Sequence, residues 1–149
     1  MKLNDIIKEY GILVEIQIDG ASSGNPGLSG AGIVIKNDGN VKEYSIPLGV
    51  LSNHEAEFFS LIKALEICGR EYPCDMVAVQ SDSQLVVQAV EKNYVKNPNF
   101  FELLMKVNEL KGQFPLFFIK WIPSNKNRRA DQLARQAIHK QKKAENVPF

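Results

Sequence analysis

Cysteine is scarce in this chain of 149 residues, where only Cys68 and Cys74 occur. Two cysteines without the spacing of a metal site cannot make a disulfide framework, so we expect packed thiols in a reducing compartment. Uninterrupted apolar runs of membrane-span length are absent, and residues 1 to 11 alternate charged with apolar side chains, unlike a signal peptide. We therefore expect a cytoplasmic protein with no membrane association.

A strong excess of charge of one sign is also absent, because the formal net charge is +1. This value excludes wholesale attraction to nucleic acid but leaves a local basic patch open. A hydrophobic fraction of 44% and a charged fraction of 23% are typical of globular proteins. The length suffices for one domain with a complete core.

Hydrophobic periodicity indicates strands and helices in a definite order. Strands are predicted over 12–19, 31–36, 41–48, 76–81 and 115–122, and helices over 52–69, 83–92, 99–113 and from about 127 onward. Ser52 and Glu55 have capping-box spacing, and Gly39 can adopt positive φ in a hairpin turn. The order predicts an α/β fold with a mixed five-stranded sheet, in which three strands are antiparallel and two more run parallel to the first, flanked by helices.

Acidic residues recur where buried strands end. Asp19 follows the first predicted strand and Asp82 the fourth, and crossover connections would bring these two strand ends together. Glu57 and Asp131 lie in the first turns of helices that could point at the same edge. Carboxylates from four distant segments repel one another unless divalent cations neutralise them, and hard oxygen ligands select Mg²⁺ or Mn²⁺.

Four motifs carry these acids, and together they resemble the motif set of type 1 ribonuclease H (ribonuclease HI) over residues 12 to 140. They are Asp19-Gly-Ala-Ser-Ser-Gly-Asn-Pro-Gly27, Asn53-His-Glu-Ala-Glu57, Ser81-Asp-Ser-Gln84 and Asn127-Arg-Arg-Ala-Asp131. The resemblance implies a ribonuclease H-like fold and endonucleolytic hydrolysis of the RNA strand of RNA/DNA hybrids, which leaves 5′-phosphate products. It also implies two Mg²⁺ ions, replaceable by Mn²⁺, held by the catalytic residues Asp19, Glu57, Asp82 and Asp131.

A two-metal mechanism assigns a role to each acid. Our hypothesis is that Asp19 bridges both ions, Glu57 and Asp82 complete the leaving-group site, and Asp131 completes the nucleophile site. The resemblance further implies that Gly24, Asn25 and Asn53 sense the 2′-hydroxyls of the RNA, while Gln84 contacts bases through the minor groove. Further substrate contacts are expected from Lys96, Lys126, Asn127, Arg128 and Arg129.

The chain departs from well-studied bacterial members of the family in two places. No histidine occurs between Pro123 and Arg129, so either turnover is slower or another residue, Lys126 or Arg128, takes its place. The segment 93–99 is short where those members insert a basic protrusion, so we expect weak hybrid binding.

The domain limits follow from the motifs. We expect an N-terminal extension over 1–11, a ribonuclease H domain over 12–142 and a tail over 143–149, in a monomer. The basic run His139–Lys143 either contacts nucleic acid or has no role. An exonuclease on the same fold is disfavoured, because Ala21 stands where a second acid of the first strand is expected. A catalytically weak or retired nuclease that binds nucleic acid is the remaining alternative.

Overall fold

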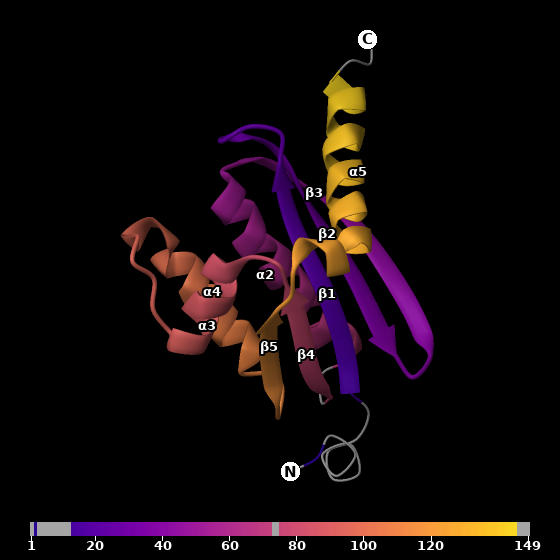
Figure 1. Ribbon diagram of the computed structural model, residues 1–149, viewed down its shortest axis with the longest axis vertical. Helices are drawn as coiled ribbons and strands as arrows, with labels where there is room; N and C mark the ends of the chain where they lie inside the picture. The colour runs from indigo at the N-terminus through magenta and orange to yellow at the C-terminus, as the bar shows by residue number, and fades with distance from the viewer. Residues whose placement is uncertain (1, 3–12, 73–74, 146–149) are drawn as a thin grey trace.

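The computed structural model describes residues 2, 13–72 and 75–145, so most of the predicted extension over 1–11 and the last four residues lie outside the described part. A single sheet has the strand order β3-β2-β1-β4-β5 (Figure 1). Its strands are β1 (Leu13–Ser22), β2 (Gly27–Asn37), β3 (Asn40–Leu51), β4 (Met76–Ser81) and β5 (Phe117–Trp121). The pairs β1–β2 and β2–β3 are antiparallel, whereas β4 runs parallel to both β1 and β5. This arrangement confirms the predicted mixed sheet.

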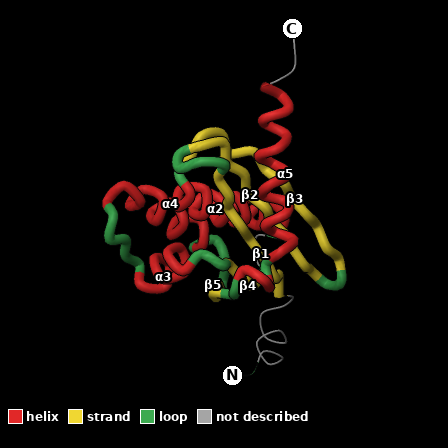
Figure 2. The backbone as a smooth tube through the Cα atoms, turned by 45° about the horizontal axis from the view of Figure 1, so that its top comes forward, coloured by secondary structure: helices red, strands yellow, loops and turns green. Residues whose placement is uncertain are grey.

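Helices cover both faces of the sheet unequally. They are α2 (Asn53–Glu71), α3 (Gln84–Lys92), α4 (Phe101–Lys111) and α5 (Arg128–Glu145), and short 3₁₀ turns precede the last two. Figures 1 and 2 show α2, α3 and α4 gathered on one side, with α5 alone on the other. The main core lies between the sheet and the first group, around Ile16, Phe58 and Leu65. Among the described residues, no helix is both long enough and apolar enough to cross a membrane.

The predicted local signals hold where they can be checked. Ser52 Oγ accepts a hydrogen bond from Glu55 N at 3.2 Å, and Ser52 N donates to Glu55 Oε1 at 2.9 Å, which completes the capping box of α2. Gly39 has a φ of 80° in the hairpin turn between β2 and β3. Helix α2 therefore begins where the sequence indicates, at the edge of the sheet that carries the acids.

Strand β1 is longer than predicted, which changes the position of Asp19. Asp19 pairs with Gly32, and the ladder continues through Gly20 and Ala21 to the pair of Ser22 with Ser29. Asp19 therefore lies inside a paired strand and not at its end. The hydrophobic pattern stops at Asp19, but pairing uses backbone groups and continues through small residues. For the same reason β2 begins at Gly27, four residues before the predicted start at residue 31.

Candidate active site

Two glycines beside Asp19 allow helices to approach the sheet closely. A Cβ on Gly32, the β2 residue paired with Asp19, would collide with the carbonyl oxygen of Ala130 in α5. A Cβ on Gly20 in β1 would collide with the carbonyl oxygen of Ala56 in α2. Because no side chain separates these backbones, the first turn of α5 lies against β2 beside Asp19, and the first turn of α2 lies against β1.

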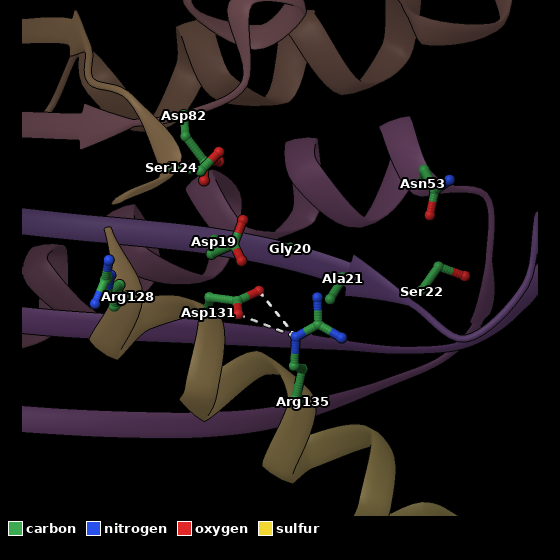
Figure 3. Close-up of a pocket in the computed structure, with 10 residues that line it drawn as sticks. All are labelled: Asp19, Gly20, Ala21, Ser22, Asn53, Asp82, Ser124, Arg128, Asp131 and Arg135. Atoms are coloured by element: carbon green, nitrogen blue, oxygen red, sulfur yellow. Dashed lines mark hydrogen bonds and ion pairs between the residues drawn. The ribbon is translucent and has the colours of Figure 1, made fainter. Parts of the chain in front are cut away.

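Three of the predicted acids meet at one cavity. Asp19, Asp82 and Asp131 line a hollow of about 360 Å³ at this edge of the sheet (Figure 3). Asp19 is 9% exposed. Its pKa is raised from 3.8 to about 9, first by burial, then by the negative charge of Asp82 and by hydrogen bonding with, and the charge of, Asp131. Burial and the two neighbouring acids therefore oppose ionisation of Asp19 in the absence of a cation.

Asp131 is the only one of these three acids for which the described residues include an ion-pair partner. Arg135, one helical turn later, donates from Nε to both carboxylate oxygens at 3.2 and 3.0 Å. The arginine side chain is 73% exposed and lines the same cavity (Figure 3). The spacing of four residues puts the two side chains on one face of α5.

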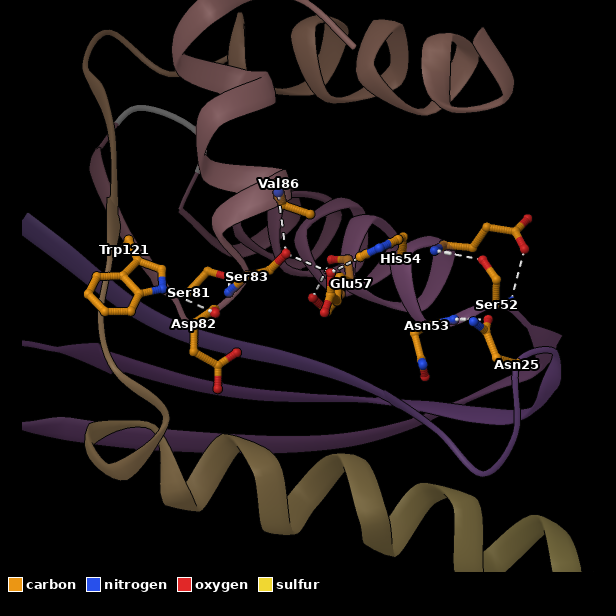
Figure 4. Close-up of polar contacts among 12 residues, drawn as sticks. Asn25, Ser52, Asn53, His54, Glu57, Ser81, Asp82, Ser83, Val86 and Trp121 are labelled. Carbon is orange, nitrogen blue, oxygen red and sulfur yellow. Dashed lines mark hydrogen bonds and ion pairs between the residues drawn. The ribbon is translucent and has the colours of Figure 1, made fainter. Parts of the chain in front are cut away.

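Asp82 is held by backbone contacts from neighbouring residues. Trp121 Nε1 donates to the carbonyl oxygen of Asp82 at 3.2 Å. Ser83 N donates to Ser81 Oγ at 3.1 Å, and Ile122 N donates to the carbonyl oxygen of Ser81 at 2.9 Å. These bonds fix the turn between β4 and α3, so that the Asp82 side chain projects toward α5 (Figure 4).

Glu57 takes a different orientation from the other acids and does not line the cavity. Its Oε2 accepts a hydrogen bond from Ser83 Oγ at 2.6 Å and lies 3.1 Å from His54 Nδ1 (Figure 4). Its backbone lies beside Gly20, where α2 touches β1. Glu57 therefore stands next to the Asp82 turn, with its carboxylate engaged by two neighbours, and its role as a metal ligand stays a prediction.

The donor chemistry of the cavity fits a divalent cation. Asp19, Asp82 and Asp131 offer hard oxygen donors, which Mg²⁺ or Mn²⁺ selects. Burial, and then the charges of the other two acids, raise the pKa of Asp19, and a bound cation would offset both effects. Within the described ranges, no three acidic, histidine or cysteine side chains already stand in the geometry of a metal site.

The residues expected to sense ribose lie together at one end of the cavity. Asn53 N donates to Asn25 Oδ1 at 3.1 Å, which ties the start of α2 to the β1–β2 loop. The carbonyl oxygen of Gly24, in the same loop, accepts from Ser22 Oγ. Gly24, Asn25 and Asn53 are exposed, and Asn53 and Ser22 line the cavity. The structure thus brings this predicted group together beside the acids.

The remaining predicted contacts are dispersed. Arg128 lines the cavity, and Gln84 is exposed at the first residue of α3, directly after the Asp82 turn. Lys96 lines a separate cavity of about 740 Å³ between α3 and the segment before α4. Arg129 points away from the acids, because its guanidinium binds both carboxylate oxygens of Glu43 on β3.

Asn127 is 1% exposed, so the predicted substrate contact is wrong for this structure. Its Nδ2 donates to the carbonyl oxygen of Ile18 at 2.7 Å, one residue before Asp19. This bond ties the loop before α5 to β1 and positions Asp131 beside Asp19. Asn127 precedes the first residue of α5 as expected of a cap, but its buried Oδ1 has no hydrogen-bond partner among the residues that the structure describes.

Sequence reasoning missed three residues of the site. Ser83 lies in one of the four motifs, but its contact with Glu57 of α2 forms only when α2 and α3 pack together. Trp121 reaches the site through the pairing of β4 with β5, which nothing in its sequence context indicates. Arg135 could have been found, since a cation four residues after Asp131 on a helix predicts an ion pair.

Comparison with known proteins agrees with the fold. Residues 17–137 match a protein family described as reverse transcriptase-like. The EbsB protein of Enterococcus faecalis is 45% identical over 129 residues, which cover 86% of this chain and 96% of that protein. Ribonuclease H of Desulforamulus reducens is 32% identical, with 91% of each chain covered.

Solved structures give the same result. Ribonuclease H1 of Halobacterium salinarum has a TM-score of 0.80 at 32% identity, covering 86% of this chain and 98% of that one. LC11-RNase H1, solved in complex with an RNA/DNA hybrid, has a TM-score of 0.79 at 36% identity, with 86% and 98% covered. The mixed sheet with acids at its centre is thus a ribonuclease H-like fold. Within that class, the chain belongs to the type 1 ribonuclease H family.

Proposed function

We propose that this protein cleaves the RNA strand of RNA/DNA hybrids at the cavity lined by Asp19, Asp82 and Asp131. The observation that carries the proposal is the convergence of these carboxylates from β1, the β4–α3 turn and α5 on one solvent-accessible hollow. The solved hybrid complex of LC11-RNase H1, at 36% identity, supports the choice of substrate.

Two groups of residues beside the acids would bind the substrate. Gly24, Asn25 and Asn53 form an exposed small-residue surface at the end of the cavity, where a minor groove can approach closely and present its 2′-hydroxyls. Arg128 and Arg135 add positive charge at the cavity wall, which attracts the phosphodiester backbone.

The proposed reaction requires Mg²⁺ or Mn²⁺. Asp19, Asp82 and Asp131 would hold the metal, with Glu57 joining from α2 once its carboxylate leaves Ser83 or His54. Two such ions supply activation of a water and stabilisation of the departing 3′-oxygen when they are bound. The carboxylates would hold the ions, and the nucleophile would be water, so that no protein side chain need attack the phosphate.

Hydrolysis of a labelled hybrid tests this function, with DNA duplex and double-stranded RNA as parallel substrates. We expect cleavage of the hybrid in Mg²⁺ or Mn²⁺ and none in chelator. Asp82→Asn should lower the rate by on the order of 10² to 10³ or more, because it removes charge from the reacting centre. Asp38→Asn, at an exposed turn, is the matched control and should leave the rate unchanged.

Two results would contradict the proposal. Cleavage that persists in chelator would exclude the metal, and an active Asp82→Asn variant would exclude the carboxylate assignment. Hybrid binding by the wild type without cleavage in either metal would identify a retired nuclease that serves as a binding module.

A further inference from the structure

Helix α5 has a net positive charge, whereas the rest of the chain has a net negative one. Its 18 residues include six lysine and arginine residues and two acidic residues, so its formal charge is +4, compared with +1 for the whole chain. The remaining residues together are therefore net acidic. The positive charge is concentrated on the element whose first turns border the cavity.

The helical periodicity of α5 places some of these basic side chains on the same side of the helix. Ala130, Ala134 and Ala137 are buried on the side that packs on β2 and β3. Residues seven apart on a helix point nearly the same way, which relates Arg128, Arg135 and Lys142. We call these three the α5 cation row. Its first two members line the cavity, so Lys142 extends the same side of the helix, roughly 10 Å beyond Arg135.

The helix is fixed to the sheet directly beside Lys142. Gly49 N donates to Gln141 Oε1 at 3.0 Å, and Gln141 Nε2 donates to the carbonyl oxygen of Ser29 at 2.7 Å. These bonds tie α5 to β3 and β2 at residue 141, three residues after the last buried apolar residue of the helix, Ile138. The basic run His139–Lys143, whose role the sequence left open, is thus part of a helix anchored to the sheet.

The opposite flank of α5 faces away from the cavity and makes a structural contact. Arg129 binds Glu43 on β3, and Lys140, eleven residues later, points within roughly 20° of the same direction. Lys140 is exposed like Lys142, but it lies on the side away from the cavity. The chain therefore contains two lysines of equal charge, two residues apart, of which one belongs to the α5 cation row.

We propose that the α5 cation row is a binding surface for the phosphodiester backbone of nucleic acid outside the catalytic cavity. The inference rests on the proposed function, since the same hybrid occupies the cavity and the row. At about 3.4 Å per nucleotide along a strand, Lys142 contacts phosphates roughly three nucleotides from those beside Arg135. The contact is independent of base sequence and contributes affinity through counterion release.

Salt dependence of binding tests the row. Binding of an RNA/DNA hybrid to the wild type, Lys142→Gln and Lys140→Gln is measured in chelator over a range of salt concentrations. Loss of one phosphate contact lowers the slope of log affinity against log salt by about 0.7 to 0.9. We expect this change for Lys142→Gln only, and we expect it to vanish on a hybrid too short to extend past the cavity. Melting of each variant checks that the fold is intact.

The outcomes separate this inference from the proposed function. An unchanged slope for Lys142→Gln would overturn the proposed binding surface, because Lys142 would then make no phosphate contact. An equal loss of slope for Lys140→Gln would overturn it too, because the effect would then depend on net charge alone. A wild type that cleaves hybrids while Lys142→Gln binds normally rejects the row and keeps the proposed function. If the wild type binds hybrids through Lys142 but does not cleave them, the result supports the α5 cation row as a binding surface and rejects the proposed nuclease activity.

Discussion

Replacing Asp19 by asparagine should stabilise the metal-free protein at neutral pH. The carboxyl group has a pKa of about 9 in the folded chain and 3.8 as its ordinary value, chiefly because it is buried beside Asp82 and Asp131. The folded state therefore binds more protons than the unfolded state between these values, and stability falls as pH rises through that window. Below 3.8 both states are protonated, and the penalty disappears.

The size of the effect follows from linkage. One pKa unit corresponds to about 1.4 kcal/mol, and pH 7 lies about three units above 3.8, so the proton that Asp19 takes up on folding costs roughly 4 kcal/mol at neutral pH. Asp19→Asn removes this proton uptake while it keeps a similar shape. The free energy of unfolding of the variant should exceed that of the wild type by an amount approaching this value at pH 7 and shrinking toward pH 4.

Urea unfolding in chelator, followed by circular dichroism at several pH values, measures the difference. Asp38→Asn, whose carboxylate is exposed in the β2–β3 turn, should keep the pH dependence of the wild type. Addition of Mg²⁺ should narrow the gap, because the wild type gains a ligand that the asparagine variant binds less well. Identical pH dependence of the wild type and Asp19→Asn would refute the burial and charge argument.

Three further results are expected. Gly32→Ala should lower the free energy of unfolding in urea by about 1 to 3 kcal/mol and reduce hybrid cleavage, because its Cβ meets the Ala130 carbonyl oxygen. Gly112→Ala is the control, because the added Cβ has room there, and it should change the free energy of unfolding by less than about 0.5 kcal/mol. Trp121→Phe frees the Asp82 carbonyl oxygen, so it should raise the activation free energy of cleavage by more than it lowers the free energy of unfolding. Equal changes in these two free energies would contradict this. Burial raises the pKa of Cys68 to about 12, so its thiol should resist iodoacetamide at pH 8 in the folded chain and react in urea, as peptide mass spectrometry would show.

Much of the fold was accessible from the sequence because local rules and tertiary packing agree. The capping box at Ser52 starts α2 as expected, and the hairpin turn at Gly39 sets the antiparallel strands. Strand ends were less predictable. The ladder past Asp19 joins glycine, alanine and serine residues, whose small side chains carry no alternating pattern, although their backbone groups pair as well as any.

The sequence by itself determined which acids to consider, since four motifs in the order of the ribonuclease H set contain Asp19, Glu57, Asp82 and Asp131. Only the tertiary structure decided how they meet. Gly32 lets α5 lie close against β2, and Asn127 ties the start of α5 to β1, so Asp131 reaches the cavity. The Glu57 carboxylate instead accepts a hydrogen bond from Ser83. These contacts join residues far apart in the chain. Their partners are set by strand pairing and helix packing, which no local spacing encodes.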